Sequence, residues 1–237
     1  MTTNRIDEHF VSLTAPDTFA AERYQGLRLQ IERFRQNADR RVIAITSPGA
    51  GDGKTLTSVN LAAVLARESN ARVLLIDADL RRSSAGITFG IAAGTPGFAD
   101  LISGHGTRPL SALIQRPEPC PFDLLPSGSS SASIQQLFRS PRLKEVLDEA
   151  RREYEYVLLD TPPLVPVFDA AVLARAVDGV IVVVAADRTP RKMLAAALDL
   201  LEPSTVVGIV FNADNSPLFG YNSSAYRPYF TARAARA

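Results

Sequence analysis

Cysteine and histidine are nearly absent from this chain, and its net charge is small. The single cysteine, Cys120, excludes an intrachain disulfide and fits a reducing cytosol. The two histidines, His9 and His105, stand in polar or glycine-rich sequence and predict no metal cluster. A formal net charge of +1 gives no electrostatic reason to expect nucleic acid as a partner.

Long hydrophobic runs are also missing. A membrane helix needs about 18 consecutive apolar residues, and the nearest run, Gly179–Ala186, is far shorter. The N-terminus, Met1–Phe10, is polar and has no apolar signal core. The sequence therefore predicts a soluble chain, and any association with a membrane is expected to come through a partner.

Short apolar runs are present at intervals along the 237 residues, 46% of which are hydrophobic, enough for one well-packed domain or two small ones. The runs are continuous rather than alternating, which is typical of parallel strands covered on both faces. Helical patterns lie between most of them, so we expect an α/β fold with a doubly wound, mostly parallel sheet flanked by helices. The expected strands are 42–46, 72–77, 156–160, 180–185 and 206–211, with 122–125 as a candidate sixth.

Helix boundaries are marked at several points. A helix is expected from Pro16 to about Arg35, and its apolar side should dock on the domain or on a neighbour. Ser140-Pro141 and Thr189-Pro190 each place a hydroxyl before a proline, a pattern that predicts a capped helix start. The residues after 211 lose all periodicity and are expected to form an irregular tail.

A glycine-rich loop between a strand and a helix is the most informative feature. Glycines allow backbone N–H groups to face a phosphate, lysine reaches the β/γ-phosphates, and threonine ligates Mg²⁺. Pro48 stands where the strict P-loop pattern has its first glycine, and the alternative is a strand-to-helix turn without a ligand. The context favours ATP binding by a P-loop NTPase-like domain through Gly49, Ala50, Gly51, Asp52, Gly53, Lys54 and Thr55.

Acidic residues end two of the expected strands. Asp77 and Asp79 are two residues apart after one strand, so we expect both carboxylates to point the same way. Asp160 ends another strand in the manner of a Walker B acid, which holds Mg²⁺. The alternatives are helix capping by Asp77 and Asp79 and a turn at Asp160. Arg81 and Arg82 follow and are expected to be solvated surface arginines.

This arrangement resembles the bacterial tyrosine kinases (BY-kinases) of capsule and exopolysaccharide synthesis. The likeness covers about residues 20–214 and is carried by Leu75–Arg82 (LIDADLRR) and Leu159–Pro163 (LDTPP), beside the phosphate loop. The resemblance implies an ATP-dependent protein-tyrosine autokinase that regulates polysaccharide polymerisation and export. It implies ATP and Mg²⁺ as cofactors, with Lys54, Asp77 and Asp79 catalytic, with Thr55, Asp79 and Asp160 at the metal, and with Asn212 at the adenine.

The same resemblance implies self-phosphorylation between subunits of a homo-oligomer. Acceptors would be Tyr221, Tyr226 and Tyr229 in a tail, residues 215–237, following a kinase domain at 38–214. Residues 1–37 would hold the oligomerisation helix, whose Glu-x-x-Arg-x-x-Arg motif is matched by Glu22 and Arg28 but has Gln25 in place of the middle arginine. The implied activator is a membrane-spanning chain-length regulator, either fused or separate. Because this sequence has no membrane segment, it resembles the stand-alone type, which would be cytoplasmic and peripheral to the inner face of the plasma membrane.

Two other classes remain open. A Min/Par-type ATPase would carry an additional lysine early in the phosphate loop, where this chain has Gly49. A regulatory subunit of the export machinery would bind or hydrolyse ATP without phosphorylating protein. The presence of Lys54 and the strand-end acids favours catalysis over a purely regulatory subunit.

Overall fold

The computed structural model describes residues 7–36, 39–104 and 108–214. Its centre is one six-stranded sheet in the order β3-β2-β4-β1-β5-β6, and every pairing of these strands is parallel. The doubly wound α/β prediction is therefore confirmed. The strands are β1 (Val42–Thr46), β2 (Val73–Asp77), β3 (Asp123–Leu125), β4 (Tyr156–Asp160), β5 (Gly179–Ala185) and β6 (Val206–Asn212).

The sheet divides the core into two layers. Side chains alternate along each strand, so Val42 and Ala44 of β1 pack on one face and Ile43 and Ile45 on the other. Covered on both faces, β1, β2, β4 and β5 are buried along their whole length. This explains why their sequences are continuous apolar runs.

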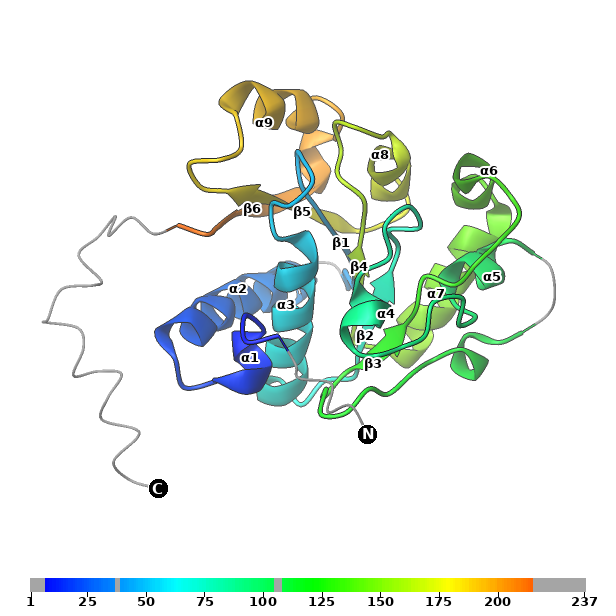
Figure 1. The fold of residues 1–237 in the computed structure, drawn as a ribbon, viewed down its shortest axis with the longest axis horizontal. Coiled ribbons are helices and arrows are strands. Elements are labelled where there is room, and N and C mark those ends of the chain that lie inside the picture. The colour runs from blue at the N-terminus through cyan, green and yellow to red at the C-terminus, as the bar shows by residue number, and fades with distance from the viewer. Residues whose placement is uncertain (1–6, 37–38, 105–107, 215–237) are drawn as a thin grey trace, which may run out of the picture.

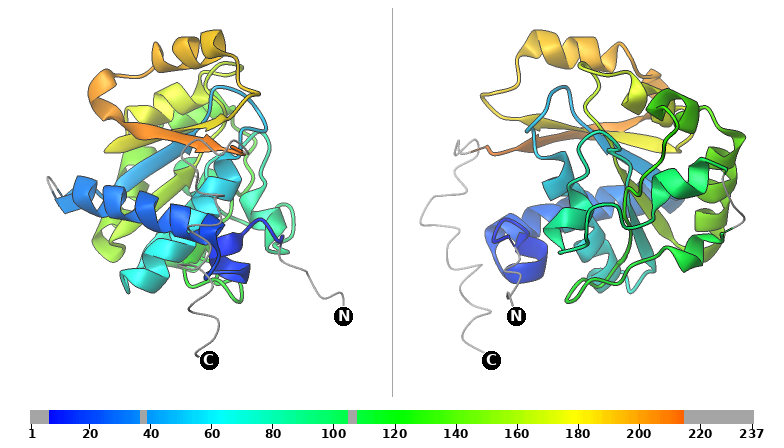
Figure 2. Two further views of the ribbon diagram at one scale, coloured as in Figure 1. Left: turned by 90° about the vertical axis from the view of Figure 1, so that its left-hand side faces the viewer. Right: turned by 45° about the vertical axis from the view of Figure 1, so that its right-hand side comes forward.

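Helices cover both faces of the sheet (Figures 1 and 2). One face is covered by α1 (Val11–Thr14), α2 (Phe19–Gln36), α3 (Lys54–Glu68) and α4 (Ala85–Thr88). The opposite face is covered by α5 (Phe98–Ile102), α6 (Ile134–Phe138), α7 (Pro141–Glu153), α8 (Asp169–Ala174) and α9 (Arg191–Leu198). Short 3₁₀ turns, η1 (Leu110–Ala112) and η2 (Pro203–Thr205), complete the described elements.

The predicted N-terminal helix is α2. Ile31 is fully buried, and Tyr24, Leu27 and Phe34 pack against the same core, so the helix docks on its own domain. Among the helices of residues 7–36, 39–104 and 108–214, none combines the length and the hydropathy that a membrane span requires.

A helix begins at both predicted places, but only the first has the predicted cap. Ser140 caps α7 by accepting a hydrogen bond from the Arg142 N–H, and Pro141 is the first helical residue. At α9 the helix begins at Arg191 without a side-chain cap. The Thr189 hydroxyl instead contacts the phosphate loop, because that loop lies beside the end of β5.

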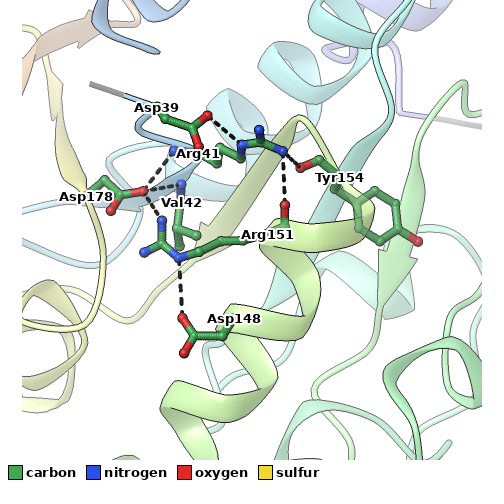
Figure 3. Close-up of polar contacts among 7 residues, drawn as sticks. All are labelled: Asp39, Arg41, Val42, Asp148, Arg151, Tyr154 and Asp178. Atoms are coloured by element: carbon green, nitrogen blue, oxygen red, sulfur yellow. Dashed lines mark hydrogen bonds and ion pairs between the residues drawn. The ribbon is translucent and has the colours of Figure 1, made fainter. Parts of the chain in front are cut away.

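A polar network fixes the amino-terminal edge of the sheet, opposite the glycine-rich loop (Figure 3). Asp178 Oδ2 accepts hydrogen bonds from the N–H groups of Arg41 and Val42, each at 2.8 Å, and from Arg151 of α7. The Arg41 guanidinium in turn donates to the backbone carbonyl of Arg151, at 3.0 Å. The start of β1, the start of β5 and the end of α7 are thereby joined.

Candidate functional site

The glycine-rich loop forms an anion-binding arrangement at the end of β1. Gly51 and Gly53 have φ values of +83° and +99°, which side-chain-bearing residues rarely adopt. A Cβ on Gly53 would also lie 1.9 Å from Asn212 Nδ2, so only glycine fits there. Among the described residues no side chain caps α3, so its first N–H groups and its dipole are available to a phosphate.

Lys54 is the first residue of α3, and its side chain is only 9% exposed. Within the described residues, no hydrogen bond or ion pair holds its ammonium group in place. Its charge nevertheless lowers the pKa of Asp160, so it lies within electrostatic reach of the strand-end acids. A buried cation without a fixed partner is well suited to bind a phosphate.

Thr55 and Asp160 are in direct contact. The Thr55 hydroxyl donates to Asp160 Oδ2 at 2.6 Å. Because this uses its only proton, Thr55 Oγ1 accepts from Ser84 Oγ, 2.9 Å away. Burial raises the pKa of Asp160 to about 7, against the lowering effects of the Thr55 hydrogen bond and Lys54.

Asp77 lies directly opposite Asp160 in the parallel register of β2 and β4. Its Oδ2 accepts from Ser83 Oγ at 2.9 Å and from the N–H groups of Ala85 and Gly86 at the start of α4. Oδ1 is buried and has no hydrogen-bond partner among the described residues. Burial and, to a smaller extent, the negative charge of Asp79 raise the pKa of Asp77. One oxygen of Asp77 therefore caps α4, and the other is available for chemistry.

Asp79 differs from Asp77 in its contacts. Its Oδ1 accepts from the N–H groups of Arg82, at 3.0 Å, and Arg81. The expectation that Asp77 and Asp79 point the same way used strand alternation, but β2 ends at Asp77 and alternation no longer applies beyond it. The two carboxylates are hydrogen-bonded to separate backbone turns.

The oxygen atoms around Thr55 fit a Mg²⁺ ion, which prefers hard oxygen ligands and keeps several waters. In the described ranges no group of three acidic, histidine or cysteine side chains converges as a ready-made metal cage. Asp77 Oδ1 is nevertheless unsatisfied, and Asp160 is a buried carboxylate whose ionised form lacks a fully compensating cation. Thr55 and Asp160 are the residues best placed to hold the ion, directly or through water.

Arg81 is not simply a solvated surface arginine. It forms an ion pair with Asp169, at 2.5 Å, and only 5% of the Asp169 side chain is exposed. The pair lines a pocket of about 450 Å³ whose rim includes Phe168, 70% exposed. Arg82 is exposed, as expected.

The remaining predicted residues lie elsewhere. Asn212, at the end of β6, donates to the Asp52 carbonyl at 3.1 Å, so it touches the phosphate loop; its contact with adenine stays a prediction. Glu22 is exposed on α2, whereas Arg28 is engaged within the chain by Glu32 and Gln25. Tyr221, Tyr226 and Tyr229 lie outside the described residues.

Sequence reasoning missed Ser84 and misassigned Thr189. Ser84 stands in no recognisable spacing from Thr55, and only the fold brings them together. The sequence predicts a helix cap at Thr189, because Thr-Pro before a helical pattern looks the same whether the hydroxyl caps the helix or contacts the phosphate loop. No local signal distinguishes the two roles.

A phosphate loop after a central strand, with acids at the ends of neighbouring parallel strands, defines a P-loop nucleoside-triphosphate-binding protein. A family model described as an AAA domain matches residues 40–199. The tyrosine-protein kinase YwqD of Bacillus subtilis (strain 168) is 30% identical over 211 residues, which are 88% of this chain and 87% of YwqD. The chain belongs to the bacterial tyrosine kinase family.

Further relatives agree with this assignment. EpsB of Ralstonia solanacearum is 32% identical over 227 residues, 94% of this chain, but the chain spans only 30% of EpsB. The kinase domain of the Escherichia coli tyrosine kinase ETK superposes with a TM-score of 0.81 at 28% identity, covering 90% of this chain and 82% of that domain. The family assignment replaces the Min/Par-type alternative.

Proposed function

We propose that this protein transfers the γ-phosphoryl group of ATP to tyrosine and thereby regulates exopolysaccharide or capsule polymerisation and export. The observation that carries the proposal is the pairing of Asp77 with Asp160 beside Thr55 and Lys54. Relatives supply the substrate class, because YwqD and ETK are named as tyrosine kinases.

Phosphoryl transfer depends mainly on positioning and charge neutralisation, because its transition state is loose. The α3 N–H groups and Lys54 would bind the β- and γ-phosphates. Mg²⁺, when bound near Thr55 and Asp160, would neutralise phosphate charge. We also propose that Asp79 acts in catalysis and near the Mg²⁺ ion.

The acceptor tyrosine would lose its proton to Asp77 Oδ1 as its oxygen bonds to the γ-phosphorus and the bond to the β-phosphate oxygen breaks. A tyrosine pKa near 10 is poorly matched to an ordinary carboxylate near 4. Burial raises the pKa of Asp77 and narrows this gap. A partnerless, buried oxygen therefore makes Asp77 a better base than an exposed aspartate.

The acceptors we propose are Tyr221, Tyr226 and Tyr229 of another subunit in a homo-oligomer, with Glu22 and Arg28 at the subunit contact. The proposed activator is a membrane-spanning polysaccharide co-polymerase, which would place the chain at the inner face of the plasma membrane.

The direct test is incubation of the purified protein with ATP and Mg²⁺, followed by immunoblotting for phosphotyrosine, with and without the activator's cytoplasmic segment. Lys54→Met should abolish the signal, and Lys144→Met, which changes an exposed lysine of α7, should leave it unchanged. Changing Tyr221, Tyr226 and Tyr229 together to Phe should remove the acceptors and preserve ATP turnover.

The competing function is an ATP-binding or ATP-hydrolysing regulatory subunit that phosphorylates no protein. ATP turnover without phosphotyrosine, in the presence of the activator segment, would favour it. Phosphate mapped by mass spectrometry to other tyrosines would overturn only the tail assignment.

A further inference from the structure

Asp52 lies inside the phosphate loop, yet its carboxylate points into the protein. The side chain is buried, with 6% exposure. Its Oδ2 accepts from the Gly49 N–H at 3.0 Å, across the loop, and its Oδ1 accepts from the Thr189 hydroxyl at 2.8 Å. Both oxygens are thus engaged by donors of the chain itself.

The Thr189 hydroxyl is held in the direction that this contact requires. Its oxygen accepts from the Ala185 N–H at 3.0 Å, which leaves the hydroxyl proton for Asp52. Arg188, the preceding residue, donates to the Gly51 carbonyl at 2.6 Å. The segment between β5 and α9 therefore contacts the loop at two points, and Asn212 of β6 adds the contact to the Asp52 carbonyl.

A carboxylate beside a phosphate site would repel the ligand and would be costly to bury without donors. The contacts with Gly49 and Thr189 offset that cost. They also restrain a segment in which Gly49, Gly51 and Gly53 would otherwise give the backbone large conformational freedom. Asp52 therefore acts on the shape of the loop rather than on the phosphate.

We infer that Asp52 and Thr189 form a positioning pair that holds the phosphate loop in its binding shape before the nucleotide arrives. Ordering a flexible loop reduces binding affinity, and a preformed loop avoids that cost. The β5–α9 segment is thereby part of the nucleotide site, although Thr189 donates no group to the phosphate. The inference depends on nucleotide binding, one part of the proposed function, and not on phosphoryl transfer to tyrosine.

The test compares Thr189→Val, which is nearly isosteric but lacks the hydroxyl, with Thr189→Ser, which keeps it. Thr205→Val is the matched control, because within the described part of the chain the Thr205 hydroxyl bonds only the nearby Glu202 carbonyl. The affinity for ATP in the presence of Mg²⁺ is measured by calorimetry, and hydrogen exchange is followed in the nucleotide-free full chain. Thr189→Val should weaken ATP binding about tenfold, the effect of one lost hydrogen bond to a charged group.

In the nucleotide-free protein, exchange of the Gly49 N–H should become faster in Thr189→Val and stay close to wild type in Thr189→Ser and Thr205→Val. A purely structural role would lower the melting temperature while leaving the affinity of the folded protein and loop exchange unchanged. That result, or an affinity of Thr189→Val within twofold of wild type, would overturn the inference. Wild type that binds ATP without phosphorylating tyrosine would refute the proposed kinase and leave the inference intact.

Discussion

At the scale of single residues, the glycines at 26 and 53 illustrate opposite requirements. Gly53 needs its positive φ and has Asn212 where a side chain would lie. A Cβ on Gly26, in contrast, would meet no described atom within 4 Å apart from its chain neighbours and its own helix backbone. Gly53→Ala should therefore destabilise the fold by roughly 1–3 kcal/mol and abolish ATP binding. Gly26→Ala should stabilise α2 by about 0.5–1 kcal/mol, because alanine loses less backbone entropy in a helix.

Urea unfolding and ATP titration of the two variants measure these effects. Gly26→Ala also serves as the control, since it introduces the same methyl group far from the loop. A Gly53→Ala protein that binds ATP normally would show that the loop is more adaptable than its contacts with Asn212 imply.

The sequence predicted which residues lie near the phosphate loop, and their catalytic and metal-binding roles stay predictions. Gly-Lys-Thr after an apolar strand identified Lys54 and Thr55, and strand-end position identified Asp77 and Asp160. The second role of Asp77, as a cap for α4, and the contact between Thr55 and Ser84 depend on how the 83–86 turn folds back. Such long-range contacts leave no periodic trace in a sequence.

At the scale of elements, the Asp178 network joins β1, β5 and α7. Asp178→Asn removes the charge that Arg151 and two backbone N–H groups share, and should cost about 2 kcal/mol of unfolding free energy. Asp199→Asn is the matched control, because it changes an exposed aspartate just after α9. Chemical denaturation at pH 6 measures the difference.

The effect should depend on pH in a defined direction. Burial raises the pKa of Asp178, but the hydrogen bonds from Arg151, Val42 and Arg41 outweigh it, and the net shift is below the ordinary value of 3.8. The stabilisation is therefore complete above 3.8 and is lost as the pH falls through the lower, folded-state pKa. A stability difference between wild type and Asp178→Asn that stayed the same at pH 3 and pH 6 would contradict this.

The sequence predicted the elements best where burial on both faces requires a continuous apolar run. Strands β1, β2, β4 and β5 are covered on both faces, so their apolar runs locate them within a residue. The short helices α4, α6 and α8 were not predicted, because each spans fewer than two helical turns and so shows no repeated apolar spacing. Strand order was also beyond prediction, since it depends on which crossover packs against which face.

At the scale of the whole molecule, the end of β6 lies beside the phosphate loop, just before the proposed tail. This position bears on whether phosphate is transferred within one chain or between subunits. Asn212 touches Asp52, and Tyr229 follows Asp214, the last described residue, by 15 positions. A fully extended segment of that length reaches about 50 Å. The tail that we propose would on that length reach its own site or that of a neighbour, and a flexible link would give an effective concentration on the order of millimolar.

We expect transfer between subunits, and complementation distinguishes the two routes. Lys54→Met, with intact tyrosines, is mixed with the chain that carries Phe at Tyr221, Tyr226 and Tyr229. Phosphotyrosine on the Lys54→Met chain would show transfer between molecules. The rate of phosphorylation per chain should be constant at concentrations at which the oligomer persists. It should fall once dilution dissociates the oligomer, and light scattering measures that dissociation.

Strictly intramolecular transfer predicts the opposite results. The mixture would stay unphosphorylated, and the wild-type rate per chain would not change on dilution. Phosphorylation between subunits should also weaken the oligomer, because the added negative charges repel one another.

The central strand β1 has a partner on each side, β4 and β5, and is tied at both ends. Asp178 holds its first residues, and the loop contacts of Asp52 lie just beyond its last. No local fraying can free the middle of such a strand, so the amide protons of Ile43, Ala44 and Ile45 should exchange only when the entire domain opens. The ligand-binding loop is therefore joined to a strand that we expect to exchange only on global opening, so the contacts of Asp52 that preform the loop rest on a rigid frame.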